Sequence, residues 1–144
     1  MKNLLVVIAI SFSLYGLAEN SPNFFQAYAG QNSTNDQVIA NAFKNQQSDI
    51  QVQGSGRVIK ILSDDTNGSQ HQRFILKLSS GQTLLIAHNI DLASRINRLQ
   101  KGDTVSFYGE YEWNSKGGVI HWTHHDPRGR HVGGWLKHEG KIYQ

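Results

Sequence analysis

The chain has 144 residues, with 14 Lys and Arg against 11 Asp and Glu, and it contains no cysteine. This length suits a single domain with a core of its own. The lack of cysteine excludes disulfides, thiol catalysis and thiolate metal sites. The net charge of +3 is a small basic excess, so the pI of 9.3 is weak grounds for a nucleic-acid partner.

Residues 1–18 have the three parts of a cleavable secretory signal. Lys2 supplies the positive charge, residues 4–14 are almost wholly apolar, and residues 16–18 provide a small-residue exit. The apolar run is shorter than the roughly 20 residues of a membrane span, although an uncleaved anchor is the alternative. Export predicts a periplasmic or extracellular protein. Its mature chain would have 126 residues and no further segment apolar enough to span a membrane.

Residues 19–48 are predicted to be a linker followed by a short helix. The segment 19–34 is polar, and Thr34, Asn35 and Asp36 can cap a helix. Val38, Ile39, Ala42 and Phe43 then follow at helical spacing. We expect this helix to plug one end of the domain formed by residues 49–144.

Alternation of apolar and polar residues predicts five strands in residues 49–144. They cover residues 50–62, 71–78, 82–88, 104–113 and 119–125, and a small hairpin is possible near the C-terminus. Gly54 and Gly56 indicate a bend in the first strand. After Asp91, apolar residues at i, i+4 and i+7 predict a short helix between strands three and four. This order predicts a mainly β, five-stranded OB-like barrel; another small antiparallel barrel or sandwich is the alternative.

Several runs in residues 50–144 resemble an uncharacterised family of exported bacterial proteins, a domain of unknown function. These runs are 64–65, 71–74, 87–91, 109–114 and 117–127, the last including the sequence HWTHHD at 121–126. The resemblance implies membership of that family and supplies no activity, substrate or catalytic residue.

A histidine-rich stretch is the first predicted site, because four of the seven histidines fall in residues 121–131. His121 and His125 share one face of a strand but would stand about 13 Å apart at the usual rise, so a shared metal needs further ligands. The predicted set is His88, Asp91, His121, His125 and Asp126, which suits zinc or manganese. The alternative is that these histidines only hydrogen-bond loops.

The second predicted site is a ligand surface on the second strand and the loop before it. Its residues are Asp64, Asp65, His71 and Arg73. Arg73 offers a forked donor to phosphate or carboxylate, and strands two and three carry the usual ligand surface of this fold. A solvated strand face beside an Asp-Asp turn is the alternative. Glu110 and Glu112 share the outer face of the fourth strand, so they do not flank a substrate as a glycosidase pair would.

These features leave three hypotheses for function. The first is an exported domain that binds a small or anionic ligand without catalysis. The second is a metal-dependent hydrolase of the phosphodiesterase or nuclease type, in which a metal-bound water attacks. The third is an interaction partner in the cell envelope. Nucleic acid is a possible ligand but is not favoured, because Tyr108 on the predicted outer face lies among acidic residues that repel phosphate.

Overall fold

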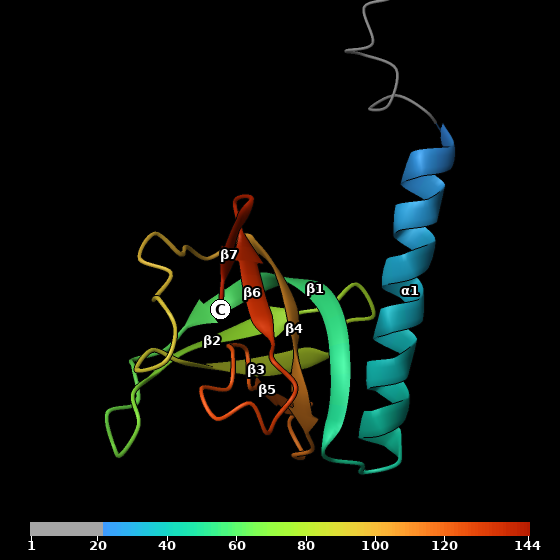
Figure 1. Cartoon of the computed structure of the whole chain (residues 1–144). Helices are drawn as coiled ribbons and strands as arrows, with labels where there is room; N and C mark the ends of the chain where they lie inside the picture. The colour runs from blue at the N-terminus through green and yellow to red at the C-terminus, as the bar shows by residue number, and fades with distance from the viewer. Residues whose placement is uncertain (1–21) are drawn as a thin grey trace, which may run out of the picture.

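The computed structural model describes residues 22–144, so the predicted signal at residues 1–18 lies outside the described residues. In that part of the chain one helix, α1 (Pro22–Lys44), precedes seven strands (Figure 1). The strands are β1 (Ile50–Ile61), β2 (His71–Lys77), β3 (Thr83–Asn89), β4 (Thr104–Glu112), β5 (Val119–His121), β6 (Trp135–His138) and β7 (Lys141–Tyr143). No helix in residues 22–144 combines the length and apolarity that crossing a membrane requires.

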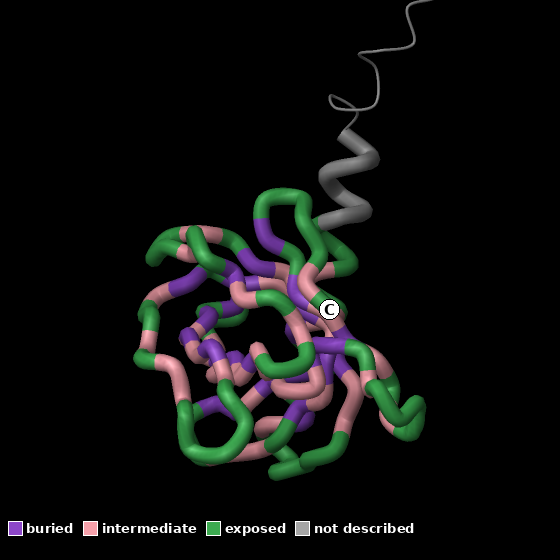
Figure 2. Tube along the Cα trace, turned by 60° about the vertical axis from the view of Figure 1, so that its left-hand side comes forward, coloured by how far each residue is buried: buried purple, intermediate pink, exposed green. Residues whose placement is uncertain are grey.

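Strands β1 to β5 form a closed barrel in the order β1-β2-β3-β5-β4, with β4 returning to β1. All neighbours are antiparallel except β3 and β5, which run parallel and pair Leu85 with Val119. The predicted five-stranded OB-like barrel is therefore confirmed, and Figure 2 shows the trace closing around its interior.

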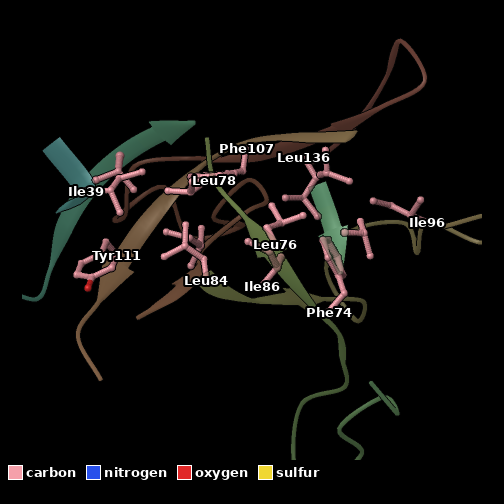
Figure 3. Packing of buried hydrophobic residues seen from close by; sticks show 14 of the residues in the cluster. Ile39, Phe74, Leu76, Leu78, Leu84, Ile86, Ile96, Phe107, Tyr111 and Leu136 are labelled. Carbon is pink, nitrogen blue, oxygen red and sulfur yellow. The ribbon is translucent and has the colours of Figure 1, made fainter. Parts of the chain in front are cut away.

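The barrel interior is filled by the alternate apolar residues that the sequence pattern assigns to one face of each strand. Phe74 and Leu76 of β2 are fully buried, and so are Phe107 and Tyr111 of β4. Figure 3 shows Ile39 of α1 at one end of this cluster and Ile96 at the other. The barrel therefore has two ends, and each is closed by residues from outside the five strands.

The long first strand belongs to both halves of the barrel. Residues 50–57 pair with β4, and residues 57–61 pair with β2. Gly54 makes room for a core ring, because a Cβ at this position would lie 2.6 Å from the Phe107 Cζ atom. The register shift of β1 lies after the glycines, between Val58 and Lys60.

The helix α1 starts at Pro22, so the predicted linker over residues 19–34 is wrong for residues 22–34, which are helical. The hydroxyls of Ser33 and Thr34 donate to the Gly30 carbonyl at 2.8 and 3.0 Å, so these polar side chains are satisfied within the helix. The helix was expected to pack on one end of the domain through its apolar residues. Ile39 and Ala42 are indeed buried in the core.

The helix predicted between strands three and four is absent, and residues 90–103 form a series of turns. Backbone groups that would bond to one another in a helix bond instead to side chains from inside the barrel. The amide of buried Gln72 bonds both the N–H and the carbonyl of Ile96, each at 2.9 Å. The His88 ring lies 3.0 Å from the Ser94 carbonyl. Ile96 is therefore buried as predicted, but in an irregular backbone.

The fifth strand is shorter than predicted, because it ends at His121 instead of residue 125. Trp122 has a φ of 56° and turns the chain out of the sheet. The chain returns to the same edge of β4 at Trp135: His121 pairs with Glu110, and Trp135 pairs with Tyr108 two residues away. The segment 122–134, here called the β5–β6 loop, is thus an excursion from one edge of β4. The C-terminal hairpin expected after it is present as β6 and β7.

Candidate functional site

The β5–β6 loop is closed at its neck and organised from within. The Gly134 N–H donates to the His124 carbonyl at 3.0 Å, which joins the two ends of the loop. The Asp126 carboxylate accepts hydrogen bonds from the N–H groups of Arg128, Arg130 and His131 at 2.9 to 3.0 Å. The bonds from Arg128 and Arg130 hold the pKa of Asp126 below its usual range. Asp126 therefore serves as the internal support of the loop.

His131 fastens this loop to the barrel. Its Nε2 atom lies 2.7 Å from Glu110 Oε2 on β4, and its Nδ1 atom lies 2.8 Å from the Val132 carbonyl. The ring stacks on the Trp122 indole, with centroids 3.9 Å apart and planes 7° apart. Desolvation lowers the pKa of His131, but the bonds to Val132 and Glu110 and the nearby carboxylates outweigh it, so the pKa is raised. The protonated ring then pairs with Glu110.

His121 lies beside the same carboxylate without a hydrogen bond. Its Nε2 atom is 3.4 Å from Glu112 Oε2 and 3.7 Å from Glu110 Oε2. That atom is buried and has no hydrogen-bond partner among the described residues. The Gln51 Nε2 atom is also buried without a hydrogen-bond partner among the described residues. Gln51 on β1 and His121 on β5 both lie opposite Glu110 in the register of the sheet. Two unpartnered nitrogen atoms therefore belong to residues that flank one carboxylate.

Two depressions adjoin along the loop and together form what we call the tryptophan groove. The larger has a volume of about 530 Å³ and the smaller about 220 Å³. Leu92 and Trp122 line both. The larger is also lined by Asp126, Pro127, Arg128, Arg130 and His131, and the smaller by His71, Ala87, Asn89, His121 and His124. The groove thus combines an apolar floor with arginine and imidazole groups.

The two guanidinium groups of the groove have no ion-pair partner in the part of the chain that the structure describes. Among the described residues, the salt bridges within 4.0 Å involve neither Arg128 nor Arg130. Both side chains are exposed. Asp126, the acidic residue nearest in sequence, is occupied by backbone N–H groups. The site can therefore offer two positive charges to an anion beside an aromatic surface.

Of the four predicted ligand residues, only His71 lines the tryptophan groove. Asp64 forms an ion pair with Arg95, and Asp65 accepts a hydrogen bond from the Asn67 N–H at 3.0 Å. The Arg73 Nε–H donates to the Ser63 carbonyl at 3.1 Å. Asp64, Asp65 and Arg73 therefore organise the loop between β1 and β2.

The five predicted metal ligands are not brought together. His88 is fully buried inside the barrel, with Nδ1 2.7 Å from the Thr123 hydroxyl. Burial lowers the pKa of His88 to about 4, so the ring is neutral at pH 7. Asp91 accepts a bond from the Gln70 N–H, His125 is exposed, and Asp126 supports the loop. Of the five predicted ligands, only His121 has a ring nitrogen close to carboxylates, those of Glu110 and Glu112.

In residues 22–144, one group of three possible ligands has all its donor atoms within 4.8 Å of one another: Asp103, His138 and Glu139. Sequence reasoning missed it because no pattern relates Asp103 to His138 on the C-terminal hairpin. His138 Nε2 lies 2.8 Å from Asp103 Oδ2, which also accepts from the Gln100 N–H at 2.9 Å. These bonds and the His138 charge hold the pKa of Asp103 down, the Gln100 bond contributing most. The group ties β6 to the turn before β4.

The protein is therefore a small OB-like barrel with a polar and aromatic groove at the loop between β5 and β6. The chain belongs to the family described as "Protein of unknown function (DUF3465)", whose pattern it matches over residues 23–144. The family resemblance seen in residues 50–144 is thereby confirmed and extended into α1. No curated protein matches the sequence.

Proposed function

We propose that this protein is a binding domain for a small anionic ligand, held in the tryptophan groove. The observation that carries the proposal is the pair of exposed guanidinium groups, Arg128 and Arg130, beside the Trp122 ring in a depression of about 530 Å³. That volume lies in the range of small-molecule sites. A phosphate or carboxylate can accept from the arginines while a flat apolar part of the ligand lies on Trp122 and Leu92.

The rigidity of the loop also supports this proposal. Asp126 fixes the backbone at Arg128 and Arg130, and the His131 contacts hold Trp122 in place. A groove that is already ordered loses little conformational freedom when a ligand binds. The export pattern of residues 1–18 favours a ligand met in the periplasm or outside the cell.

The structure supplies no arrangement of the predicted metal ligands that would favour the hydrolase hypothesis. His88 is neutral and bonded on both ring nitrogens inside the barrel. The binding hypothesis is therefore the better of the two on geometry.

The test is isothermal titration calorimetry with phenyl phosphate, which carries a flat apolar ring and a dianionic group. The double variant Arg128→Gln/Arg130→Gln should bind at least tenfold more weakly, because each charge-assisted hydrogen bond contributes about 1.5 to 3 kcal/mol. Arg57→Gln is the matched control. Arg57 is an exposed arginine in a second depression of about 510 Å³ between α1 and the barrel. Loss of binding in Arg57→Gln, with the double variant unaffected, would move the ligand to that depression and refute the proposal.

A further inference from the structure

Both ring nitrogen atoms of His131 face oxygen atoms that accept hydrogen bonds. The Nε2 atom lies 2.7 Å from the Glu110 carboxylate, and the Nδ1 atom lies 2.8 Å from the Val132 carbonyl. A neutral imidazole has one N–H group, whereas the protonated ring has two. Only the protonated ring can therefore donate to both oxygen atoms at once.

A comparison with His88 shows what is particular about His131. The His88 Nδ1 atom lies 2.7 Å from the Thr123 hydroxyl, and its Nε2 atom lies 3.0 Å from the Ser94 carbonyl. A hydroxyl donates as well as accepts, so a neutral ring with its proton on Nε2 makes both contacts. Neither partner of His131 is a hydroxyl. The neutral form of His131 would therefore turn a ring lone pair toward an oxygen atom at one of its two contacts.

Two carboxylates favour the charged form of the His131 ring. Glu110 of β4 bonds the ring directly, and Asp126 of the loop accepts the His131 backbone N–H at 2.9 Å. Desolvation lowers the pKa of His131, but the bond to Val132 and the two carboxylates together outweigh it, so the pKa is raised above the ordinary value of 6.5. The geometry and the charges thus favour the same protonation state.

Other titratable or charged side chains lie around this contact. His121 Nε2 is 3.7 Å from Glu110 on one side and 3.4 Å from Glu112 on the other. The remaining groups are His124, whose ring is 5.3 Å from that of Trp122, and the two arginines of the larger depression, Arg128 and Arg130. Within residues 22–144, the one ion pair of the His131 ring is with Glu110. That pair is therefore the contact that responds to pH.

We propose that His131 is a pH-sensitive switch, which fastens the β5–β6 loop to β4 when its ring is protonated and releases the loop when the ring is neutral. The ring also stacks on Trp122, with centroids 3.9 Å apart, so its release loosens a residue that lines both depressions of the tryptophan groove. A pKa that is raised on folding gives stability that is present at low pH and is lost as the pH rises through the folded value. The loop is therefore fastened in acidic solution and released in alkaline solution.

The test is NMR spectroscopy of the ¹⁵N-labelled full chain without ligand, between about pH 5 and pH 9. The imidazole shifts should show both nitrogen atoms of His131 protonated at the acidic end. The Gly134 N–H donates to the His124 carbonyl at the neck of the loop. Its protection factor in hydrogen exchange should fall by about tenfold or more as His131 loses its proton, because a charge-assisted hydrogen bond is lost. The Leu85 N–H, which bonds the Gly118 carbonyl in the barrel wall, should keep its protection factor.

Variants separate His131 from the other histidines nearby. Glu110→Gln keeps the shape of the side chain and removes its charge, so the titration midpoint of His131 and the pH at which the loop opens should move down together. His131→Gln should show no opening of the loop across this pH range. His125→Gln changes an exposed histidine of the same loop, and His121→Gln changes the other histidine beside Glu110. Both controls should keep the opening seen in the wild type.

Three results would each overturn the proposal. The first is a His131 ring with one unprotonated nitrogen atom at the acidic end of the titration. The second is a constant protection factor at Gly134 while His131 titrates, and the third is an opening that persists in His131→Gln. Because no ligand is present, these results do not depend on anion binding. Weaker binding of phenyl phosphate at alkaline pH is a further consequence, which rests on the proposed function.

Discussion

The two ends of the barrel are closed in different ways. At the first end, α1 buries Ile39, and its Asp36 carboxylate accepts hydrogen bonds from the Ser79 hydroxyl and the Ser80 N–H. At the second end, Gln72 and His88 reach out from the interior and bond the irregular segment 90–103. A regular helix closes one end, and buried polar side chains close the other.

This difference explains where a site can form. The backbone of a helix satisfies itself, so α1 leaves few polar groups for a ligand. The second end needs buried polar residues to hold its turns, and it also supports the β5–β6 loop through the contact between His88 and Thr123. The Arg128 and Arg130 guanidinium groups, which have no ion-pair partner in residues 22–144, lie beside it with the partly exposed Trp122 ring. We therefore expect mutations at the second end to affect both stability and binding.

The largest expected effect is at His88. His88→Ala should lower the free energy of unfolding by about 3 to 5 kcal/mol, because it opens a cavity and removes the partner of Thr123 and Ser94. The measurement is urea unfolding at pH 8. His125→Ala, in the same region but exposed, should stay within about 0.5 kcal/mol of the wild type. Equal effects in the two variants would contradict the role given to His88.

The neck of the β5–β6 loop is expected to be nearly as sensitive. A Cβ at Gly134 would lie 2.1 Å from the Trp122 carbonyl oxygen and 2.3 Å from that of Tyr108. Both are backbone atoms that cannot move aside, so Gly134→Ala should destabilise the protein by about 2 to 4 kcal/mol. Gly129→Ala is the comparison, since Gly129 has a φ of 63° but open space around it. That variant should lose only about 1 kcal/mol in thermal unfolding.

The protein should lose stability on acidification through the titration of His88. Burial, helped by nearby His124 and His71 and opposed by the bond to the Ser94 carbonyl, lowers the pKa of His88 to about 4, whereas the unfolded value is 6.5. The unfolded chain therefore binds the extra proton between these two values. Stability from this residue is complete above pH 6.5 and falls by about 2 kcal/mol by pH 5. The measurement is the free energy of unfolding of the wild type and of His88→Gln at several pH values between 5 and 7. The free energy of the variant should depend less steeply on pH than that of the wild type, because the variant lacks the His88 titration.

The smallest effect is expected at the helix-closed end. Ser79→Ala removes one of the two groups that donate to the buried Asp36 carboxylate but keeps the Ser80 N–H. We expect a loss of about 1 kcal/mol in chemical unfolding and no change in binding at the tryptophan groove. A change in phenyl phosphate affinity in this variant would show that the two ends are coupled.

Much of the barrel follows from local sequence patterns. Alternation along β2 and β4 places Phe74, Leu76, Phe107 and Tyr111 inside, as the structure shows. The helix expected between strands three and four was predicted wrongly because a distant side chain acts on the backbone there. Gln72 replaces the hydrogen bonds of a helix at Ile96, and no pattern within residues 90–103 reveals a partner 24 positions earlier.

The site was predicted only in part for a similar reason. The sequence drew attention to His71 and His121, which line the smaller depression of the groove, although it assigned them to separate sites. It missed the contact of His131 with Glu110, because that contact depends on the positive φ of Trp122, where the chain leaves the sheet. A tryptophan at such a position gives no local signal of a turn. Gly134 was the one local signal, because a glycine often marks a position where two backbone segments lie close together.

The most direct test of a ligand site at the second end is an NMR titration of the ¹⁵N-labelled protein with phenyl phosphate. We expect chemical shift changes to concentrate on the backbone amides of Leu92, Arg128, Arg130 and His131 and on the indole N–H of Trp122, because these residues line the larger depression. The amides of Ala29, Arg57 and Lys77, which line the depression beside α1, should not move. Changes confined to those three residues, or none at saturating ligand, would contradict this expectation.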